Sequence, residues 1–344
     1  AAGHGCHRPD CQGGKGRKAH LRKKFCAGTT GAYKKTWRKN GMKKVLILGA
    51  NSYIGNSFQK YIGENYNDQY EVHKVSLRGE AWKEDDWSGY DSILNVTGKA
   101  HADIGILTEE QKQEYYAVNC DLACEAAQKA VKDGVGQYIY LSSVIVYGDS
   151  SNGGGAIHIT KDTKPAPSNF YGDSKWQAEQ KLQVLFEELK EDDGKNNTAL
   201  AIVRPPMIYG KNSKGNFKML VKLADKVPVF PNVKNERSML YVENLAEFLY
   251  LLIESQKSGV FLPQNASCVT TAQMVAAIAT AKGKNVHLCN WMNPFVALAK
   301  KMPGKIGGMA GKAFGSMVIE QELSRKEIDG YQRFGLKDSV ERSV

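Results

Sequence analysis

Tyr171 and Lys175 are the two side chains in this sequence best suited to transferring a proton. Their spacing of four residues would place them on one face of a helix. A phenol titrates near a pKa of about 10, and a nearby ammonium group would lower that pKa by favouring the phenolate. The pair could then exchange a proton with an alcohol or sugar hydroxyl. The same spacing also occurs on solvated helix faces without any chemical role, so the spacing alone leaves both interpretations open.

Two serines follow an apolar segment upstream of this pair. Residues 138–141 are typical of a buried strand, and Ser142 and Ser143 come directly after them. Hydroxyls at the carboxyl end of a parallel strand point into the ligand crevice of a doubly wound sheet. The helix that carries Tyr171 is expected to have Ser168 as its N-cap.

A glycine-containing turn links the first predicted strand to the first predicted helix. Residues 45–48 are typical of a buried parallel strand, and the turn at 49–55 follows. Gly49 would permit the tight turn, Gly55 would let helix and strand pack closely, and free N–H groups at the helix start could hold a pyrophosphate. Ser52 occupies the middle glycine position, and its hydroxyl could bond a phosphate. The predicted dinucleotide contacts in this turn are Gly49, Asn51, Ser52, Tyr53, Ile54 and Gly55.

Two more strand ends would complete this dinucleotide site. The strand at 70–77 ends near Ser76 and Arg78, where an Asp or Glu would be expected to bind an adenosine 2′-hydroxyl. No Asp or Glu stands there. NADP therefore stays open beside NAD, because Arg78 could accommodate a 2′-phosphate or be a solvated loop charge. The strand at 92–98 ends in residues that would let a cofactor approach the backbone, namely Val96, Thr97 and Gly98.

A helix over 108–132 is predicted to begin with a capping box formed by Thr108 and Gln111. Asn119 lies within this helix, and its side chain could face the site or solvent. Cys120 and Cys124 are expected to be core thiols, because the cysteines after residue 41 are scattered. That pattern predicts a reducing, cytoplasmic setting.

The charge of the chain is concentrated at its start. Residues 1–41 carry +10 of the total net charge of +11, so the remainder is nearly neutral and lacks the footprint of a nucleic-acid binder. We expect 1–41 to be a disordered basic extension, either an upstream addition before a natural start at Met42 or a basic tethering arm. The His and Cys spacings in it fit no standard zinc site, so no metal is predicted. The sequence has no apolar run of membrane-spanning length.

Alternating strands and helices predict an α/β fold with a doubly wound parallel sheet. A Rossmann domain would occupy mainly 42–210, and a smaller, interleaved C-terminal substrate-binding lobe mainly 211–344, with a final strand near 285–288. Residues 291–319 are apolar, basic and rich in glycine. They could form an amphipathic surface element that touches a membrane, although the glycines argue against one stable helix.

From Met42 to about Gly335, the chain resembles the extended short-chain dehydrogenase/reductases of the NAD-dependent epimerase/dehydratase group. It is most similar to the nucleotide-sugar 4-epimerases, such as the UDP-glucose 4-epimerases, and to the related 4-ketoreductases. The catalytic residues that this resemblance implies are Ser143, Tyr171 and Lys175. The additional cofactor contacts that it implies are Asp86, Trp87, Arg204 and Pro205. The substrate contacts that it implies are Ser143, Asn216 and Arg237, with Arg237 clamping a diphosphate.

The resemblance also implies a reaction at a sugar carbinol. Tyr171 as phenolate would take the proton of a 4-hydroxyl while hydride passes to the nicotinamide, and Ser143 would bond the same oxygen. An epimerase would return the hydride to the other face of a 4-keto sugar, whereas an NADPH-dependent reductase would perform only that return. A non-catalytic Rossmann module for regulation or binding is the remaining alternative. The implied partners are a UDP-linked sugar and a second copy of the chain, paired through helices at 108–132 and 168–190.

Overall fold

The structure is a computed structural model that describes residues 41–99, 107–149, 156–193 and 197–344. The predicted basic extension lies outside these residues, apart from Gly41. Residues 41–344 form one compact unit, so a domain boundary near residue 210 stays a prediction.

Six parallel strands make up the central sheet, in the order β10-β6-β4-β3-β1-β2. Their bounds are β1 Lys43–Leu48, β2 Tyr70–Val75, β3 Ser92–Asn95, β4 Gln137–Leu141, β6 Ala199–Val203 and β10 Gly259–Phe261. Leu48 at the end of β1 lies opposite Val75 on one side and Asn95 on the other. The chain therefore turns first to one side of β1 and then to the other, which confirms the predicted doubly wound sheet. Ligands bind at such a switch point in open α/β sheets.

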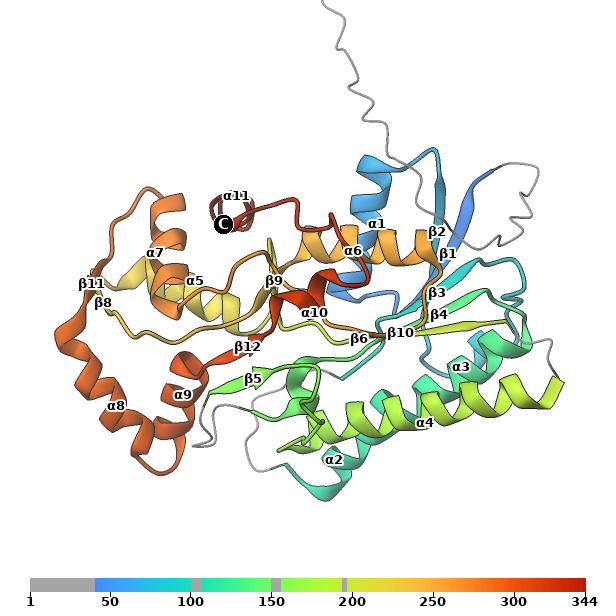
Figure 1. Ribbon diagram of the computed structural model, residues 1–344, viewed down its shortest axis with the longest axis horizontal. Helices are drawn as coiled ribbons and strands as arrows, with labels where there is room; N and C mark the ends of the chain where they lie inside the picture. Colours follow the sequence, from blue (N-terminus) through green and yellow to red (C-terminus); the bar gives the residue numbers. More distant parts are fainter. Residues whose placement is uncertain (1–40, 100–106, 150–155, 194–196) are drawn as a thin grey trace, which may run out of the picture. The chain divides into compact units, whose positions relative to one another are not determined.

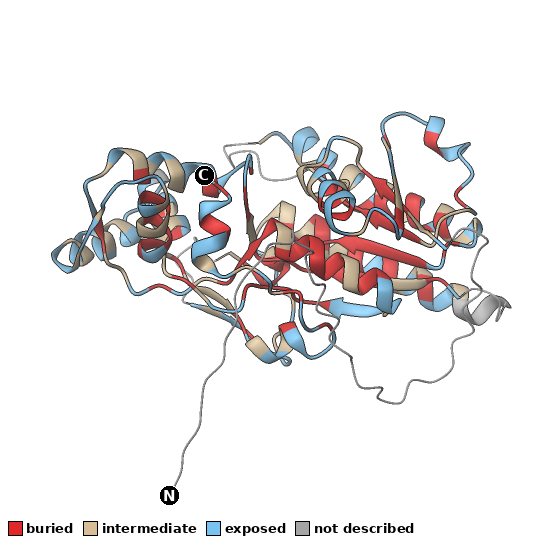
Figure 2. Ribbon diagram, turned by 90° about the horizontal axis from the view of Figure 1, so that it is seen from above, coloured by how far each residue is buried: buried red, intermediate tan, exposed pale blue. Residues whose placement is uncertain are grey.

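Helices cover both faces of this sheet (Figure 1). Helices α1 (Tyr53–Asn65) and α6 (Val242–Ser255) lie on one face, while α3 (Leu122–Lys132) and α4 (Phe170–Asp193) lie on the other. Alternate residues of β1 serve the two cores: Val45 and Ile47 join the α1–α6 core, and Leu46 and Leu48 join the α3–α4 core. Since both faces of the strand are covered, its apolar run is continuous. Figure 2 shows the resulting layer of buried residues along the sheet.

The helices begin largely where their caps predict. Helix α2 (Glu109–Tyr116) starts with the capping box of Thr108 and Gln111, and a π-helical turn, η2 (Ala117–Asp121), joins it to α3. The prediction for Ser168 is wrong by one residue. Asn169 caps α4, because its Oδ1 accepts a hydrogen bond of 2.9 Å from the Gly172 N–H three residues on.

The rest of the chain forms short parallel pairs and helices beside the sheet. The pairs are β5 (Ile157–Ile159) with β12 (Met317–Ile319), β7 (Met207–Tyr209) with β9 (Met239–Tyr241), and β8 (Val229–Pro231) with β11 (His287–Cys289). The helices are α5 (Asn216–Lys226), α7 (Thr271–Ala281), α8 (Asn293–Lys301), α9 (Lys305–Phe314), α10 (Gln321–Arg325) and α11 (Leu336–Glu341). Single 3-10 turns occur at η1 (Ala81–Lys83), η3 (Val144–Tyr147) and η4 (Asn290–Met292). The last predicted strand thus exists as β11, but it pairs with β8 outside the central sheet. Within the described ranges, each helix is too short or too polar to cross a bilayer.

Candidate active site

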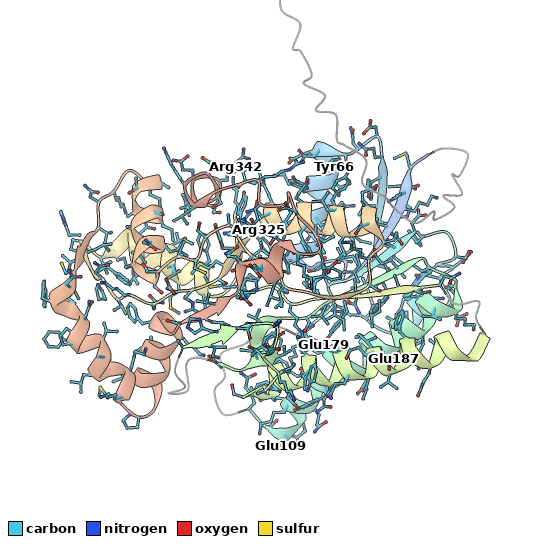
Figure 3. The ribbon with its side chains drawn as sticks, viewed as in Figure 1. Tyr66, Glu109, Glu179, Glu187, Arg325 and Arg342 are labelled. Atoms are coloured by element: carbon cyan, nitrogen blue, oxygen red, sulfur yellow. The ribbon has the colours of Figure 1, made fainter. Side chains whose placement is uncertain are left out.

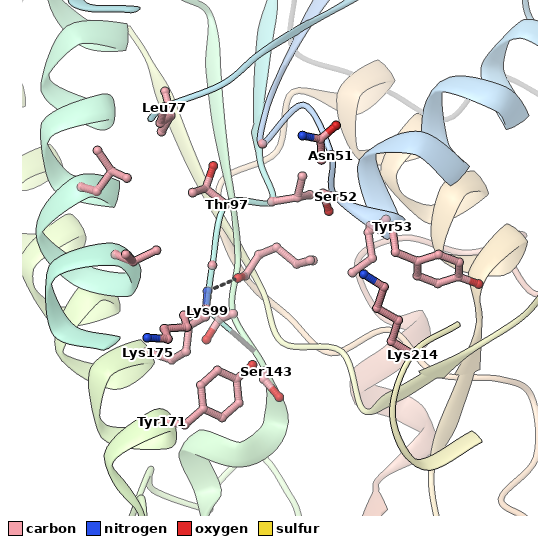
Figure 4. Close-up of a pocket in the computed structure, with 18 of the residues that line it drawn as sticks. Asn51, Ser52, Tyr53, Leu77, Thr97, Lys99, Ser143, Tyr171, Lys175 and Lys214 are labelled. Atoms are coloured by element: carbon pink, nitrogen blue, oxygen red, sulfur yellow. Dashed lines mark hydrogen bonds between the residues drawn. The ribbon is translucent and has the colours of Figure 1, made fainter. Parts of the chain in front are cut away.

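A cavity of about 970 Å³ opens at the carboxyl ends of β1, β3 and β4 (Figure 4). Most of the predicted site residues line it. They are Gly49, Asn51, Ser52, Tyr53, Ile54, Arg78, Val96, Thr97, Gly98, Ser143, Tyr171, Lys175 and Pro205. The topological switch point and the sequence motifs therefore converge on one place.

The glycines of the first turn are required by close approaches. Gly49 has φ +109°, and a Cβ added there would lie 3.2 Å from Thr97 Oγ1. A Cβ on Gly55 would lie 2.8 Å from Ile47 Cγ2, so only glycine lets α1 pack this closely on β1. Gly55 does not line the cavity, and its contribution is to this packing.

The start of α1 has the features of an anion-binding site. Ser52 is the N-cap, and its Oγ accepts a hydrogen bond from Gly55 N at 3.4 Å. The hydroxyl predicted to bond a phosphate therefore caps the helix with its lone pair. No acidic residue occupies the first turn, so the positive end of the helix dipole faces the cavity unopposed by a carboxylate of its own helix.

Buried hydroxyls in the cavity wall also fit a polar ligand. Among the described residues, Thr97 Oγ1 and Ser213 Oγ are buried without a hydrogen-bond partner, and both residues line the cavity. A buried hydroxyl left unpaired is costly, so such atoms point to a bound group with donors and acceptors. An extended dinucleotide would suit this wall, because it could bond the two hydroxyls and the N–H groups at the start of α1. The glycines would let it approach the backbone.

Ser143 and Tyr171 meet because α4 packs against the turn η3. Ser143 is the N-cap of η3, and its Oγ accepts from Ile145 N at 3.3 Å. A Cβ on Gly172 would lie 2.8 Å from the Ile145 carbonyl oxygen, so glycine at this position lets α4 approach. Figure 4 shows the Tyr171 ring beside Ser143, and the two side chains are hydrogen-bonded.

Lys175 lies one turn further along α4 and is only 4% exposed. Its Nζ donates a hydrogen bond of 3.0 Å to the Leu141 carbonyl and lies 4.7 Å from the centroid of the Tyr140 ring. A Cβ on Gly98 would lie 3.2 Å from Nζ, so the glycine leaves room for the ammonium group. Burial lowers the pKa of Lys175 to about 8, and the charge of Glu179 opposes this change.

The predicted lowering of the Tyr171 pKa does not occur in this geometry. Burial raises the pKa of Tyr171 to about 12, the proximity of Tyr115 adds to the rise, and the hydrogen bond with Ser143 opposes it. The ammonium group of Lys175 is bonded to the Leu141 carbonyl. The phenol is therefore held in its protonated form at neutral pH, as a proton donor.

Arg204 does not line the cavity, contrary to its predicted contact with the nicotinamide. It is buried behind the cavity wall, where its Nε donates to both carboxylate oxygens of Glu179 at 3.1 and 3.0 Å. Glu179 is itself fully buried and accepts a further hydrogen bond from Ser142. Since Glu179 lies one turn after Lys175, this ion pair fixes the part of α4 that carries the candidate catalytic residues. Pro205, the next residue, does face the cavity.

The two residues expected at the adenine also lie outside the cavity wall. Trp87 is 1% exposed and stacks on Trp82 with ring centroids 5.7 Å apart, so it belongs to the core under α3. Asp86 is exposed, and its Oδ1 accepts from Ser88 N at 2.9 Å. The Trp87 ring turns inward because burying an indole is favourable, and contact of either residue with adenine stays a prediction.

Two of the three expected substrate residues, Asn216 and Arg237, lie outside the cavity wall as well. Asn216 is exposed at the first position of α5. Arg237 Nη1 donates to the Lys312 carbonyl on α9. Burial lowers the pKa of Arg237, and the nearby Asp149 opposes this. Their roles in substrate binding stay predictions.

Several cavity residues escaped the sequence analysis. Lys99 and Glu114 form an ion pair at one side, and Lys214 enters from the loop before α5, opposite Ser143 in Figure 4.

Asn119 proves to be fully buried in the π-helical turn, where it accepts from Lys99 N at 2.8 Å and donates to Ser174 Oγ at 3.0 Å. A π-helical turn often marks a functional position, but no periodicity in the sequence announces it.

Comparisons with known proteins agree with this arrangement. The family model described as NAD dependent epimerase/dehydratase family matches residues 45–261. The chain is 31% identical over 224 residues to a UDP-glucose 4-epimerase of Vibrio cholerae, a match that covers 63% of each protein. It is 26% identical over 229 residues to the N-acetyl-alpha-D-glucosaminyl-diphospho-ditrans,octacis-undecaprenol 4-epimerase of Escherichia coli O157:H7, covering 62% of this chain and 64% of that protein. The chain thus spans less than two thirds of the length of either relative.

A solved structure has the same fold. It is the UDP-glucuronic acid 4-epimerase of Bacillus cereus in complex with NAD, which matches with a TM-score of 0.63 and 15% identity. The match covers 87% of this chain and 94% of the epimerase chain. At this identity, the likeness concerns the fold alone.

Proposed function

Since this chain belongs to the NAD-dependent epimerase/dehydratase family, we propose that it is an enzyme acting at C4 of a UDP-linked sugar. It would oxidise the carbinol to a 4-keto intermediate and re-reduce it as the epimer. The observation that carries this proposal is the grouping of Ser143, Tyr171 and Lys175 in the wall of one dinucleotide-sized cavity.

The cavity residues would hold NAD or NADP in a defined way. The N-terminus of α1 would bind the pyrophosphate, and the backbone at Gly49 and Gly98 would allow close contact. Ser76 and Arg78 line the cavity just after β2, and neither is an Asp or Glu that would repel a 2′-phosphate. A nicotinamide bound beside Tyr171 would accept hydride from the sugar and return it.

Tyr171 would move the proton of the reacting oxygen. As a phenolate it accepts the proton of the 4-hydroxyl, and as a phenol it donates that proton back to the ketone. The ammonium group of Lys175 would stabilise the phenolate, and the Ser143 hydroxyl would hydrogen-bond the same sugar oxygen as charge develops on it.

A second candidate function is an NADPH-dependent 4-keto-sugar reductase, which two observations favour. Burial raises the pKa of Tyr171 and so favours the phenol, which is the form that a reductase needs at the start of its reaction. Arg78 lines the cavity just after β2, and neither Ser76 nor Leu77 before it is acidic, which suits a 2′-phosphate.

Turnover without added cofactor separates the two candidates. Purified protein is incubated with UDP-glucose or UDP-N-acetylglucosamine, and the epimer is measured by chromatography. Epimer formation supports the first candidate, while turnover that requires both NADPH and a keto sugar supports the second. The mass of any dinucleotide released on denaturation shows whether NAD or NADP is held.

A Tyr171→Phe variant tests the chemistry itself. We expect a loss of about 100-fold or more in rate, because proton transfer by a positioned side chain contributes that much. Tyr90→Phe is the matched control, since the Tyr90 hydroxyl bonds His73 on the surface at 2.8 Å. Equal activity of both variants would remove Tyr171 from the reaction, whereas a wild-type protein that converts none of the sugars tried would favour the non-catalytic alternative.

We also propose that the protein is a cytoplasmic homodimer. The free thiols Cys120, Cys124, Cys268 and Cys289 suit a reducing compartment. The dimer contact would involve α3 and α4, where Val184 on α4 is 51% exposed. Light scattering of the purified protein measures the mass, and a monomer at micromolar concentration would exclude this assembly.

A further inference from the structure

Exposed apolar side chains are concentrated in one short part of the chain. Among the described residues, seven of the twelve exposed large hydrophobic side chains lie between Leu288 and Met309. They are Leu288, Trp291, Phe295, Leu298, Met302, Ile306 and Met309. We call the segment from η4 to α9, residues 290–314, the apolar hairpin. Figure 1 shows it at one end of the described unit, away from the central sheet. Apolar surface gathered in this way marks an interaction site.

Side chains of η4, of α8 and of the residue after α8 form a continuous face. Trp291, Phe295, Leu298 and Met302 recur at the spacing of successive helical turns, and the first three are 66%, 66% and 64% exposed. The Trp291 and Phe295 rings contact edge to face with centroids 6.3 Å apart. This face is therefore ordered by its own contacts while it remains open to solvent.

Glycines fold α9 back against α8. Gly304 has φ +74° and begins α9, and a side chain on Gly307 would collide with the Met302 carbonyl. The Lys300 Nζ donates to the Phe314 carbonyl at 3.4 Å across the hairpin. The fold-back places Ile306 and Met309, which are 55% and 64% exposed, on the same short element. Such a hairpin can lie on a bilayer surface but is too short to cross it.

The chain segment that forms this surface carries charge of one sign. Between Glu254 and Glu320 the sequence has no Asp or Glu, and the hairpin itself contains Lys300, Lys301, Lys305 and Lys312. Lys300, Lys301 and Lys312 are exposed. A second copy of the same face would oppose lysine with lysine, so self-association is disfavoured. An aromatic and aliphatic face bordered by lysines is complementary to a bilayer with anionic headgroups.

We propose that the apolar hairpin docks this protein on the surface of an anionic lipid bilayer. Trp291, Phe295 and Leu298 would enter the boundary between headgroups and acyl chains, and the lysines would lie among the headgroups. This inference uses the surface alone and does not depend on the proposed reaction.

Vesicle co-sedimentation of the full-length protein tests the proposal. Vesicles of phosphatidylcholine with about 30% phosphatidylglycerol are compared with pure phosphatidylcholine at low and high salt. We expect binding to the anionic vesicles that weakens with salt. The triple substitution Trp291→Ser, Phe295→Ser, Leu298→Ser should weaken it by about tenfold or more, since about three large side chains lose their burial. All variants retain the basic residues 1–40, so the charge of those residues contributes equally to vesicle binding in every variant.

Two controls make the result specific. Met219→Ser removes a side chain that is 60% exposed on α5, and it should leave vesicle binding unchanged. Lys300→Glu with Lys301→Glu should weaken binding to anionic vesicles while circular dichroism shows an unchanged fold. The proposal is overturned if the wild-type protein binds no vesicles, if the triple variant binds as well as wild type, or if that variant instead dissociates an oligomer.

Discussion

Replacing Lys175 with methionine is expected to stabilise the protein at neutral pH, although it removes a candidate catalytic group. Burial lowers the pKa of Lys175 from 10.5 to about 8. Between these two values the unfolded chain binds more protons than the folded one, so stability rises with pH across that window. The cost of burying the charged lysine is therefore fully present below pH 8 and disappears above about pH 10.5.

The lowered pKa of Lys175 sets how much stability the Lys175→Met variant should gain. A difference of about 2.5 in pKa corresponds to about 3 kcal/mol of unfavourable free energy at pH 7. Methionine has a similar length and no charge, but it loses the hydrogen bond from Nζ to the Leu141 carbonyl, which offsets about 1 kcal/mol. The variant should therefore gain about 2 kcal/mol at pH 7. At pH 10 the ionisation cost is below about 1 kcal/mol, and the gain should vanish.

Urea unfolding of both proteins at pH 7 and pH 10 measures this difference. Titration of the tyrosines affects both proteins alike and cancels in the comparison. Lys181→Met is the matched control, because Lys181 lies on the same helix with its side chain 55% exposed, beside Asp121, and should change stability by less than about 0.5 kcal/mol. A Lys175→Met variant less stable than wild type at pH 7, or a gain that persists at pH 10, would refute the reasoning.

Three further predictions concern the elements around the cavity. Glu179→Gln should lower the free energy of unfolding in urea by about 3–5 kcal/mol, because it leaves the buried Arg204 guanidinium without its counter-charge. The control Glu187→Gln, further along α4 (Figure 3), should lower it by less than about 0.5 kcal/mol. Gly55→Ala should cost about 1–3 kcal/mol through overpacking, whereas Gly63→Ala on the same helix has open space around it and should be neutral or stabilising. Arg78→Ala should weaken NADPH binding at least tenfold more than NADH binding in fluorescence titrations, and equal losses would remove Arg78 from any role at a 2′-phosphate.

Local patterns predicted much of the fold. The apolar runs marked β1, β3 and β4 because strands covered on both faces carry continuous apolar sequence. The capping box at Thr108 is likewise local and was predicted in place. The edge strand β10 was missed because its three residues alternate too briefly to signal a strand. Its pairing with β6 depends on partners far away in the chain.

Side-chain direction was harder to predict than position. The motifs identified Arg204 and Trp87, but motif spacing does not say whether a side chain faces the cavity or the core. The Arg204–Glu179 pair joins residues on different elements, and only the packing of α4 on the sheet brings them together. Lys214 had no signal, because loops carry no periodicity.

The hydrogen bond from Arg237 to the Lys312 carbonyl joins the apolar hairpin to the arginine predicted to clamp a diphosphate. If docking of the hairpin on a bilayer changes this hydrogen bond, docking and ligand binding at Arg237 are coupled. Thermodynamic reciprocity then requires each partner to change the affinity of the other by the same factor. A diphosphate ligand would in that case strengthen vesicle binding by the same factor by which vesicles strengthen ligand binding.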